Sequence, residues 1–292
     1  MEYNFTVQDE DSGKRIDLFL ASKIKEGCSR SFIQRLIAQN EVLLNNRLIR
    51  SHHKLSPGDS IRVKIPVINN LEIKPEGIKF EIIYEDDDIL VINKPSGLVV
   101  HPAAGNASGT LANALLAYTK NLSDINPQRP GIVHRLDKET SGVMVIAKNN
   151  SAHLNLIKQF AKHKVNKKYI AIVKGVLEFD EGVIDLPIGR HSRNFRLLKV
   201  TFSEGSRDAI TRYKVLKRFK ETTLLELKPK TGRTHQLRVH LAHLGHPILG
   251  DSKYGRSEDF PRLALHAREI EFVHPSTNKR VTFFAELPKE LL

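Results

Sequence analysis

A polar cluster interrupts two apolar, strand-like runs in the stretch GIVHRLDKETSGVMVIAK, residues 131–148. The cluster ends at Gly142 and contains His134, Arg135, Asp137, Lys138, Glu139, Thr140 and Ser141. So many polar groups beside a core are costly unless they form a turn or line a site. The residues alone therefore leave two interpretations open, an ordinary polar hairpin loop and a functional loop.

Residue types suggest two further kinds of chemistry. Asp137 and Glu139 stand two residues apart and suggest the carboxylate pair of a glycosidase. Neighbours in a tight loop would struggle to face one bond across several ångströms, which disfavours this pairing. A metal site is suggested by four histidines, His235, His240, His243 and His246. Their spacings match no zinc-enzyme signature, and that segment has no acidic residue before position 251, so we expect no metal.

The elements around the cluster predict an α+β domain with a large mixed or antiparallel β-sheet and flanking helices. Strands are expected at 81–84, 89–93, 143–147, 169–173, 209–215, 223–227 and 281–284. Helices are expected at 111–118 and 152–162, the second supported by Leu154, Ile157 and Phe160. Strands outnumber helices and mostly follow one another directly, which disfavours a doubly wound fold.

A basic segment precedes this domain. Residues 14–64 contain eleven Lys and Arg against four acids. One helix is predicted by Ile16, Phe19, Leu20 and Ile24, and a second by Phe32, Ile33, Leu36 and Ile37 after Ser29 as N-cap. Asn45-Asn46 predicts a hairpin turn, and Pro57-Gly58 another turn before a strand at 61–65. We expect a small αα-β-hairpin domain at 13–66, a linker at 67–79 and the larger domain at 80–292.

The composition favours a polyanionic partner. The 292 residues carry a formal net charge of +13, and Lys and Arg that neutralise phosphates release condensed counterions. Cys28 is the only cysteine, so no intrachain disulfide or cysteine metal cage can form. No stretch is apolar enough to span a membrane, and the N-terminus has no signal-peptide run. We expect a cytoplasmic protein that does not contact membranes.

The basic segment resembles the alpha-L RNA-binding module, named after ribosomal protein S-four. The resemblance covers roughly residues 13–66 and includes the phrase Ser29-Arg30-Ser31. Asn46 stands where many such modules have glycine, and asparagine adopts the same backbone region. The resemblance implies RNA binding, with Arg30 and Arg35 as candidate contacts.

The stretch GIVHRLDKETSG resembles the signature of the RluA-type pseudouridine synthases, and the whole arrangement is similar to their RluD-like members. Three further stretches agree with this family, at 85–102, 167–175 and 228–251. The four blocks stand in the family's order and cover nearly all of residues 80–255. The resemblance implies an RNA pseudouridine synthase. Its reaction is a redox-neutral isomerisation, so no cofactor and no metal are expected.

The resemblance also implies roles for single residues. Asp137 corresponds to the family's catalytic aspartate, and Arg238 to the arginine that forms a salt bridge with it. Tyr169 corresponds to the tyrosine that stacks on the uracil. Arg135 corresponds to the residue that enters the vacated base stack, and His134 is expected to support the same loop. An ionised carboxylate in a water-excluding site needs a nearby cation, which explains the arginine.

The implied substrate is structured RNA, most simply large-subunit ribosomal RNA or its assembly intermediate, with transfer RNA as the second candidate. A rival interpretation is a non-catalytic RNA-binding ribosome-assembly factor on the same scaffold, but Asp137, Tyr169 and Arg238 are all present. A glycosidase acting on free sugars is disfavoured by the basic N-terminal segment and by the absence of tryptophan. We expect a monomer.

Overall fold

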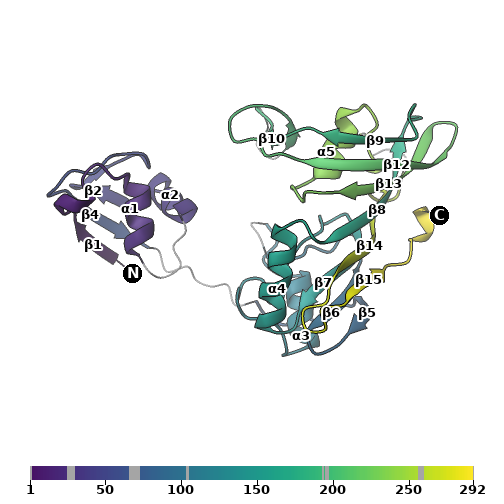
Figure 1. Cartoon of the computed structure of the whole chain (residues 1–292), viewed down its shortest axis with the longest axis horizontal. Helices are drawn as coiled ribbons and strands as arrows, with labels where there is room; N and C mark the ends of the chain where they lie inside the picture. The colour runs from purple at the N-terminus through teal and green to yellow at the C-terminus, as the bar shows by residue number, and fades with distance from the viewer. Residues whose placement is uncertain are drawn as a thin grey trace. The chain divides into compact units, whose positions relative to one another are not determined.

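The computed structural model describes residues 2–24, 30–65, 73–102, 105–192, 194, 197–255 and 260–291. The chain forms two compact units, Met1–Asn70 and Leu71–Leu292 (Figure 1). The expected N-cap Ser29 and the single cysteine, Cys28, lie outside the described residues.

The first unit contains two helices and a small antiparallel sheet. Its elements are β1 (Glu2–Thr6), η1 (Asp9–Asp11), α1 (Ile16–Lys23), α2 (Arg30–Ala38), β2 (Val42–Leu44), β3 (Arg47–Leu48) and β4 (Ser60–Lys64). The strand order is β1-β4-β2-β3. The sequence did not predict β1, which lies before residue 13 and pairs with β4 along its whole length.

The two helices of the first unit pack as their apolar spacing predicted. Ile16, Phe19 and Leu20 of α1 share one core with Ile33 and Leu36 of α2. The turn between β2 and β3 is also confirmed, because both of its asparagines adopt left-handed backbone angles, with φ of 50° and 61°. Asparagine tolerates this region better than most residues, which explains its use at this turn.

The second unit is built on a nine-stranded sheet. Its elements are β5 (Glu81–Glu85), β6 (Ile89–Lys94), α3 (Leu111–Tyr118), β7 (Ser141–Ala147), α4 (Asn150–Ala161), β8 (Asn166–Lys174), β9 (Glu181–Asp185), β10 (Ile188–Arg190), β11 (Leu198–Val200), β12 (Ile210–Arg218), β13 (Thr222–Pro229), α5 (Gln236–His243), β14 (Leu265–Val273), β15 (Arg280–Phe284) and η2 (Lys289–Leu291).

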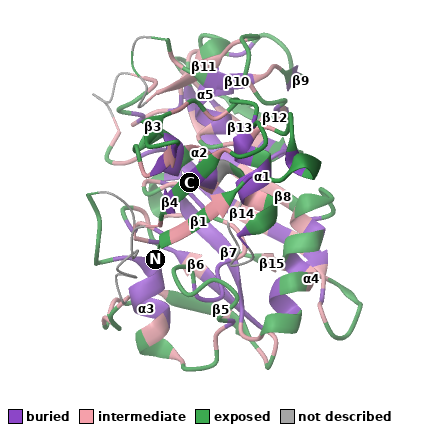
Figure 2. Ribbon diagram, turned by 90° about the vertical axis from the view of Figure 1, so that its left-hand side faces the viewer, coloured by how far each residue is buried: buried purple, intermediate pink, exposed green. Residues whose placement is uncertain are grey.

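The sheet is mixed, in agreement with the predicted fold class. Its order is β5-β6-β7-β14-β8-β13-β12-β9, with β15 paired to β14 and a separate β10-β11 pair. β7 runs parallel to β14, and the other recorded neighbours are antiparallel. β7 is buried along its entire length (Figure 2), as expected for a central strand covered on both faces.

The position of α4 confirms the predicted helix, but two of the three apolar residues that supported the prediction lie on its outer face. Leu154 and Ile157 are 61% and 41% exposed, whereas Ala152, Leu156 and the side chain of His153 are buried. Burial follows the face that contacts β7, and two large apolar residues remain on the outer face.

The segment before β5 lies on the second unit. Nδ2 of Asn113 in α3 donates to the carbonyl oxygen of Lys74 at 2.8 Å, and Ile73 and Ile78 pack against the core beside α3. In the described parts of the chain, no helix is long and apolar enough to cross a membrane.

Candidate active site

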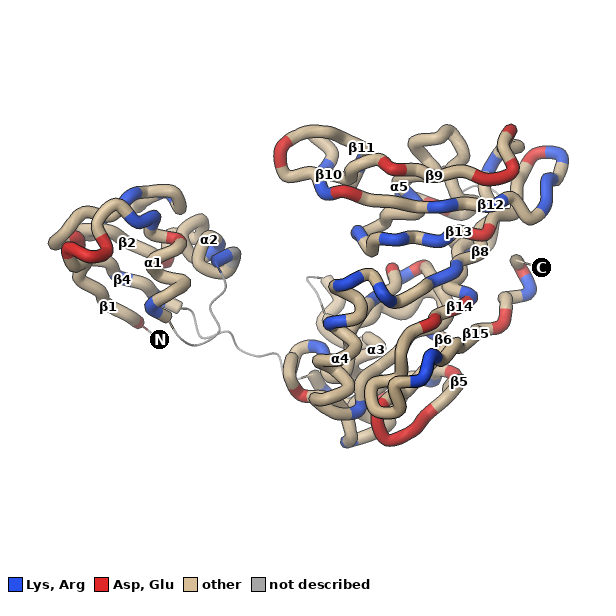
Figure 3. The backbone as a smooth tube through the Cα atoms, viewed as in Figure 1, with Lys and Arg blue, Asp and Glu red and all other residues tan. Residues whose placement is uncertain are grey.

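A pocket of about 560 Å³ opens in the second unit where three segments meet. The loop before β7 contributes Asp137, β8 contributes Tyr169, and α5 with its preceding loop contributes Arg238. Figure 3 shows Lys and Arg gathered between α4 and β8 and along β13. The sequence-predicted residues Asp137, Tyr169, Arg238, His134 and Arg135 therefore share one pocket, although His134 and Arg238 are 104 positions apart in the chain.

Two glycines hold the ends of the polar loop against the sheet. Gly131 has a φ of 67°, and a Cβ there would lie 2.6 Å from the carbonyl oxygen of Ala147. Gly142 has a φ of 120°, and a Cβ there would lie 2.2 Å from the carbonyl oxygen of Ala267 on β14. Any side chain at either position would force the strands apart. The two ends of the loop are therefore fixed in position, one against Ala147 and the other against Ala267.

Asp137 lies beside a buried guanidinium. Nη1 of Arg238 is 3.6 Å from Oδ2 of Asp137, and the aspartate side chain is 17% exposed. The same nitrogen lies 3.4 Å from Oε2 of Glu139. The other edge of the guanidinium donates to Asp251 through Nε at 2.8 Å and Nη2 at 2.7 Å. Although burial disfavours its charge, these bonds to Asp251 raise the pKa of Arg238 above its ordinary value.

A histidine approaches the other oxygen of Asp137. Nε2 of His235 is 3.9 Å from Oδ1 of Asp137, and its Nδ1 is 2.8 Å from the hydroxyl of Tyr254. Burial lowers the pKa of His235, while the charge of Asp137 acts in the opposite direction. His235 precedes α5 with a φ of 53°. This left-handed backbone turns the chain so that His235 and Arg238 both reach the carboxylate.

A buried lysine binds the backbone of this loop. Nζ of Lys94, at the end of β6, donates to the carbonyl oxygens of Pro95, Leu98 and Lys138 at 2.8, 2.9 and 3.1 Å. The hydroxyl of Ser96 donates to the carbonyl oxygen of Glu139 at 2.6 Å. Burial lowers the pKa of the Lys94 amine to about 7, while the neighbouring Asp137 acts in the opposite direction. These bonds hold the backbone carbonyl groups of the two residues that follow Asp137.

Tyr169 forms a wall of the pocket. It lies on β8, opposite Leu227 of β13 and Ala267 of β14. Burial raises the pKa of its hydroxyl, and the charge of Asp137 adds to this effect. An aromatic ring held between two strands presents a rigid apolar face to a ligand.

A model of the RNA pseudouridylate synthase family matches residues 88–243, and an S4 domain model matches residues 14–61. The chain belongs to the RNA pseudouridylate synthase family. It is 42% identical to the uncharacterized RNA pseudouridine synthase YlyB of Bacillus subtilis, over 99% of this chain and 96% of that relative. It is 40% identical to ribosomal large subunit pseudouridine synthase D of Xanthomonas campestris, over 98% of this chain and 89% of that relative.

Solved structures agree with this family. The human RNA pseudouridylate synthase domain containing 1 aligns with a TM-score of 0.60 and 28% identity. The alignment covers 75% of this chain and 86% of the human one. The matched fold is therefore that of the pseudouridylate synthases, with an S4 domain at the N-terminus of this chain.

Two predicted residues of this pseudouridine synthase sit in different surroundings within the loop. Arg135 is exposed at the pocket. His134 stacks on Phe160 with ring centroids 4.7 Å apart, and its Nε2 accepts from the backbone nitrogen of Val145 at 3.0 Å. Burial lowers the pKa of His134 to about 3, helped by the charge of Lys167. His134 is therefore neutral and bound to β7.

The predicted contacts of the S4 domain also differ from one another. Nε of Arg30 lies 3.0 Å from Oδ2 of Asp17, a buried carboxylate that also binds Arg15 and Gln34. Arg35 is exposed, with its guanidinium 5.5 Å from the centre of the Phe32 ring. Arg30 thus has a structural partner, whereas Arg35 presents its charge at the surface.

Sequence reasoning missed Lys94, Asp251 and Glu139 as members of the site. For Lys94 the signal was a lysine directly after the apolar run of β6, where a buried charge must find partners. For Asp251 the signal was an acidic residue at the end of the motif block 228–251, which also contains Arg238. Glu139 was considered only as the second carboxylate of a disfavoured glycosidase pair, yet it contacts the same guanidinium nitrogen as Asp137.

The histidines of the α5 region bind the chain itself. His240 contacts Thr211 and the carbonyl oxygen of Leu186, both at 3.0 Å, and His246 contacts the carbonyl oxygen of Lys174 at 2.9 Å. They do not form a metal-ligand group within the described residues.

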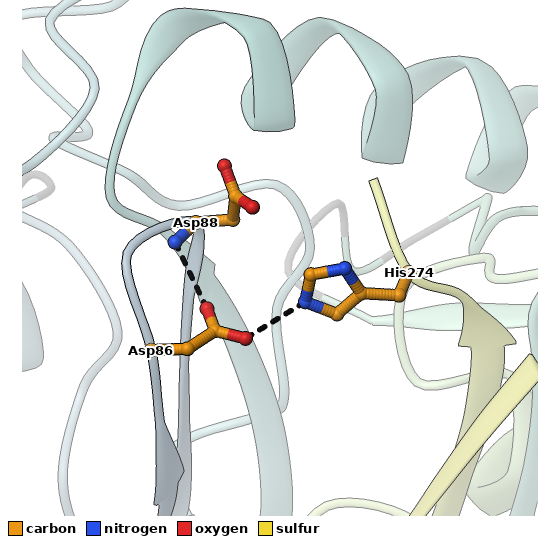
Figure 4. Close-up of side chains that lie close together, drawn as sticks. All are labelled: Asp86, Asp88 and His274. Carbon is orange, nitrogen blue, oxygen red and sulfur yellow. Dashed lines mark hydrogen bonds and ion pairs between the residues drawn. The ribbon is translucent and has the colours of Figure 1, made fainter. Parts of the chain in front are cut away.

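Among the described residues, one cluster has metal-ligand spacing, namely Asp86, Asp88 and His274 (Figure 4). Oδ1 of Asp86 accepts from the backbone nitrogens of Asp88 and Ile89, both at 2.9 Å. Its Oδ2 accepts from the hydroxyl of Tyr84 at 2.9 Å and lies 2.8 Å from Nε2 of His274. These bonds tie the turn between β5 and β6 to the end of β14.

Proposed function

We propose that this enzyme converts specific uridines of large-subunit ribosomal RNA to pseudouridine, with Asp137 as the catalytic carboxylate. The observation that carries the proposal is the 3.6 Å approach of Arg238 to Asp137 in a pocket walled by Tyr169. Relatives named ribosomal large subunit pseudouridine synthase D support the choice of RNA.

The reaction breaks the bond between N1 and C1′, turns the uracil, and joins C5 to C1′. The proton on C5 leaves and N1 gains one, so atoms and electrons balance without a cofactor. Asp137 acts at the sugar, either as a nucleophile at C1′ or as a base that removes the C2′ proton. Both roles need an ionised carboxylate, and the charge of Arg238 supports that form. Asp251 holds Arg238 in position for this task.

The base must leave the RNA stack to reach the pocket. Extrusion costs about a few kcal/mol, less in a loop or bulge. Tyr169 stacks on the detached uracil, because an aromatic face grips a base without preventing its rotation. Arg135, exposed beside Asp137, enters the vacated stack, and His134 keeps the loop attached to β7.

The N-terminal domain, residues 13–66, adds affinity for structured RNA through Arg30 and Arg35. Residues 67–79 connect it to the catalytic domain at 80–292. The enzyme acts as a cytoplasmic monomer, needs no metal, and takes free ribosomal RNA or its assembly intermediate as substrate. Transfer RNA is the second candidate substrate, and a non-catalytic role in ribosome assembly is the main alternative.

Pseudouridine mapping tests this proposal. RNA from a strain lacking the gene is incubated with the wild type or the Asp137→Asn variant, with metal chelated throughout. We expect new pseudouridines in large-subunit ribosomal RNA with the wild type and none with the variant. New pseudouridines confined to transfer RNA would show that transfer RNA, and not ribosomal RNA, is the substrate. Retained RNA binding without any new site would favour the assembly-factor role.

A further inference from the structure

Lys167 lines the same pocket as Tyr169, where its charge helps to lower the pKa of His134, but none of the contacts described so far involves its side chain. It stands two residues before Tyr169 on β8, opposite Ile270 of β14. Residues two apart on a strand point to the same face, and both of these line the pocket. Nζ of Lys167 lies 3.8 Å from the position that a Cβ on Gly232 would occupy, so it faces the loop before α5.

Within the described residues, the side-chain amine of Lys167 forms no ion pair or hydrogen bond. Burial lowers the pKa of its amine to about 8, and no carboxylate acts in the opposite direction. Lys168 provides the contrast on the other face of β8, because its Nζ lies 2.8 Å from Oε2 of Glu269. That carboxylate raises the pKa of Lys168. Two adjacent lysines thus differ in whether the chain supplies a counter-charge.

A partly buried ammonium without a counter-charge is unfavourable unless a ligand supplies one. The charged residues that line this pocket are mostly cations, namely Arg135, Lys167, Arg233 and Arg238, against the single carboxylate of Asp137. The missing partner must therefore be an anion of the substrate. We propose that Lys167 binds a backbone phosphate of the RNA next to the uridine that stacks on Tyr169.

This inference rests on the proposed function, and the position of Lys167 favours phosphate binding over a part in the chemistry. The Lys167 amine points toward Gly232 in the loop before α5, whereas Asp137 lies on the loop before β7 and faces Arg238 and His235. Two residues of strand place it roughly 7 Å along β8 from Tyr169, beside a stacked base. A compact ammonium binds phosphate oxygens as a point charge.

The binding test uses the Asp137→Asn protein, which prevents turnover, and an unmodified transcript of large-subunit ribosomal RNA. In that background, Lys167→Met should raise Kd about tenfold or more, because a charge-assisted contact is lost. The slope of log Kd against log salt should fall by about 0.7–0.9, the contribution of one phosphate. Lys168→Met is the matched control, with the same charge change on the opposite face, and should leave both values unchanged.

The pH dependence of RNA affinity gives a second measurement, because phosphate binding favours the protonated amine of Lys167. A phosphate raises the pKa of the bound amine, so RNA affinity should be constant below pH 8 and should fall as pH rises above it. Lys167→Arg keeps its charge throughout this range and should remove the fall. The wild type and Lys167→Arg share all other titratable and charged groups on the surrounding segments, so these groups do not account for a difference between the two proteins. They are His134, Asp137, His163, Lys228, Lys230, Arg233, Glu269 and Glu271.

Turnover and stability complete the test. With otherwise wild-type protein, Lys167→Met should raise KM for the transcript and leave kcat unchanged, as expected for lost binding. The variant should also melt at a higher temperature than the wild type, because it removes an unpaired buried charge. An unchanged Kd and salt slope, or a reduced kcat at unchanged KM, would overturn the assignment of Lys167. Absence of pseudouridine formation by the wild type would instead overturn the proposed function, while the binding data still decide on Lys167.

Discussion

Arg238 approaches Asp137 with one nitrogen only, because Asp251 occupies the other edge of its guanidinium. Nη1 lies 3.6 Å from Oδ2 of Asp137, while Nε and Nη2 bind Asp251 at 2.8 and 2.7 Å. The arginine side chain is 1% exposed and that of Asp251 is fully buried. A structural ion pair therefore sets the position of the guanidinium that faces the proposed catalytic carboxylate.

The first prediction concerns this buried pair. Asp251→Ala should lower the free energy of unfolding by about 3–5 kcal/mol, because it leaves an uncompensated buried charge. Glu139→Ala is the control, since Glu139 contacts the same guanidinium but its side chain is 36% exposed. Its cost should stay below about 1 kcal/mol. Denaturant unfolding of the three proteins measures both values, and equal losses would contradict a structural role specific to Asp251.

The second prediction separates the ring of Tyr169 from its hydroxyl. Tyr169→Leu removes the stacking face and should reduce kcat/KM about 5- to 150-fold, since stacking contributes about 1–3 kcal/mol per base. Tyr169→Phe keeps the ring and should retain most of the activity. The rate of pseudouridine formation in the target transcript is the measurement. A phenylalanine variant as impaired as the leucine variant would assign the function to the hydroxyl instead.

The third prediction is a pH dependence of stability. The folded chain lowers the pKa of His134 to about 3, so between pH 3 and the ordinary value near 6.5 only the unfolded chain binds this proton. The stability from neutral His134 is complete above pH 6.5 and is lost as pH falls. Its slope should reach about 1.4 kcal/mol per pH unit.

Replacement of this histidine checks the assignment. His134→Gln keeps a side-chain acceptor for Val145 and should show a smaller loss of stability between pH 6.5 and 4 than the wild type. His243→Gln, at an exposed position of α5, should keep the wild-type dependence. Burial also lowers the pKa of His266 and of His101 to about 4, so part of the acid sensitivity should remain in every variant. Identical curves for His134→Gln and the wild type would refute the contribution of His134.

The fourth prediction distinguishes the two arginines of α2. Arg35→Ala should weaken RNA binding and reduce the salt slope by about 0.7–0.9 without changing stability. Arg30→Ala should also reduce stability, because Arg30 binds the buried carboxylate of Asp17. The pKa of Asp17 is lowered to about 2 by its hydrogen bonds to Arg15, Gln34 and Arg30, against the effect of burial. Salt-dependent RNA titrations and thermal melts of the full chain separate the two outcomes.

Local patterns were sufficient to predict several elements. The apolar spacing of Ile16, Phe19 and Leu20 predicted α1, and the paired asparagines predicted the turn between β2 and β3, because both depend on nearest neighbours in the chain. Apolar spacing also predicted α4, but Leu154 and Ile157, which supported that helix, are exposed. Which face of a helix is buried depends on the surface it contacts, and here that surface is β7.

The charge and motif content of the sequence also determined the class of protein. A net charge of +13 indicated a polyanionic partner, and the spacing within each of the four motif blocks indicated the family. Such features are carried by residue type and order alone, so no knowledge of the fold was needed to recognise them. They predicted Asp137, Tyr169 and Arg238 together as site residues.

Only the tertiary structure decided how those residues are supported. Lys94 reaches the carbonyl oxygen of Lys138 across 44 positions, and Arg238 contacts Glu139 across 99. These contacts exist because the fold brings the loop before β7 against the end of β6 and against α5. The sequence does not distinguish the adjacent lysines Lys167 and Lys168. The alternation of faces along β8 gives Glu269 to one of them and the open pocket to the other.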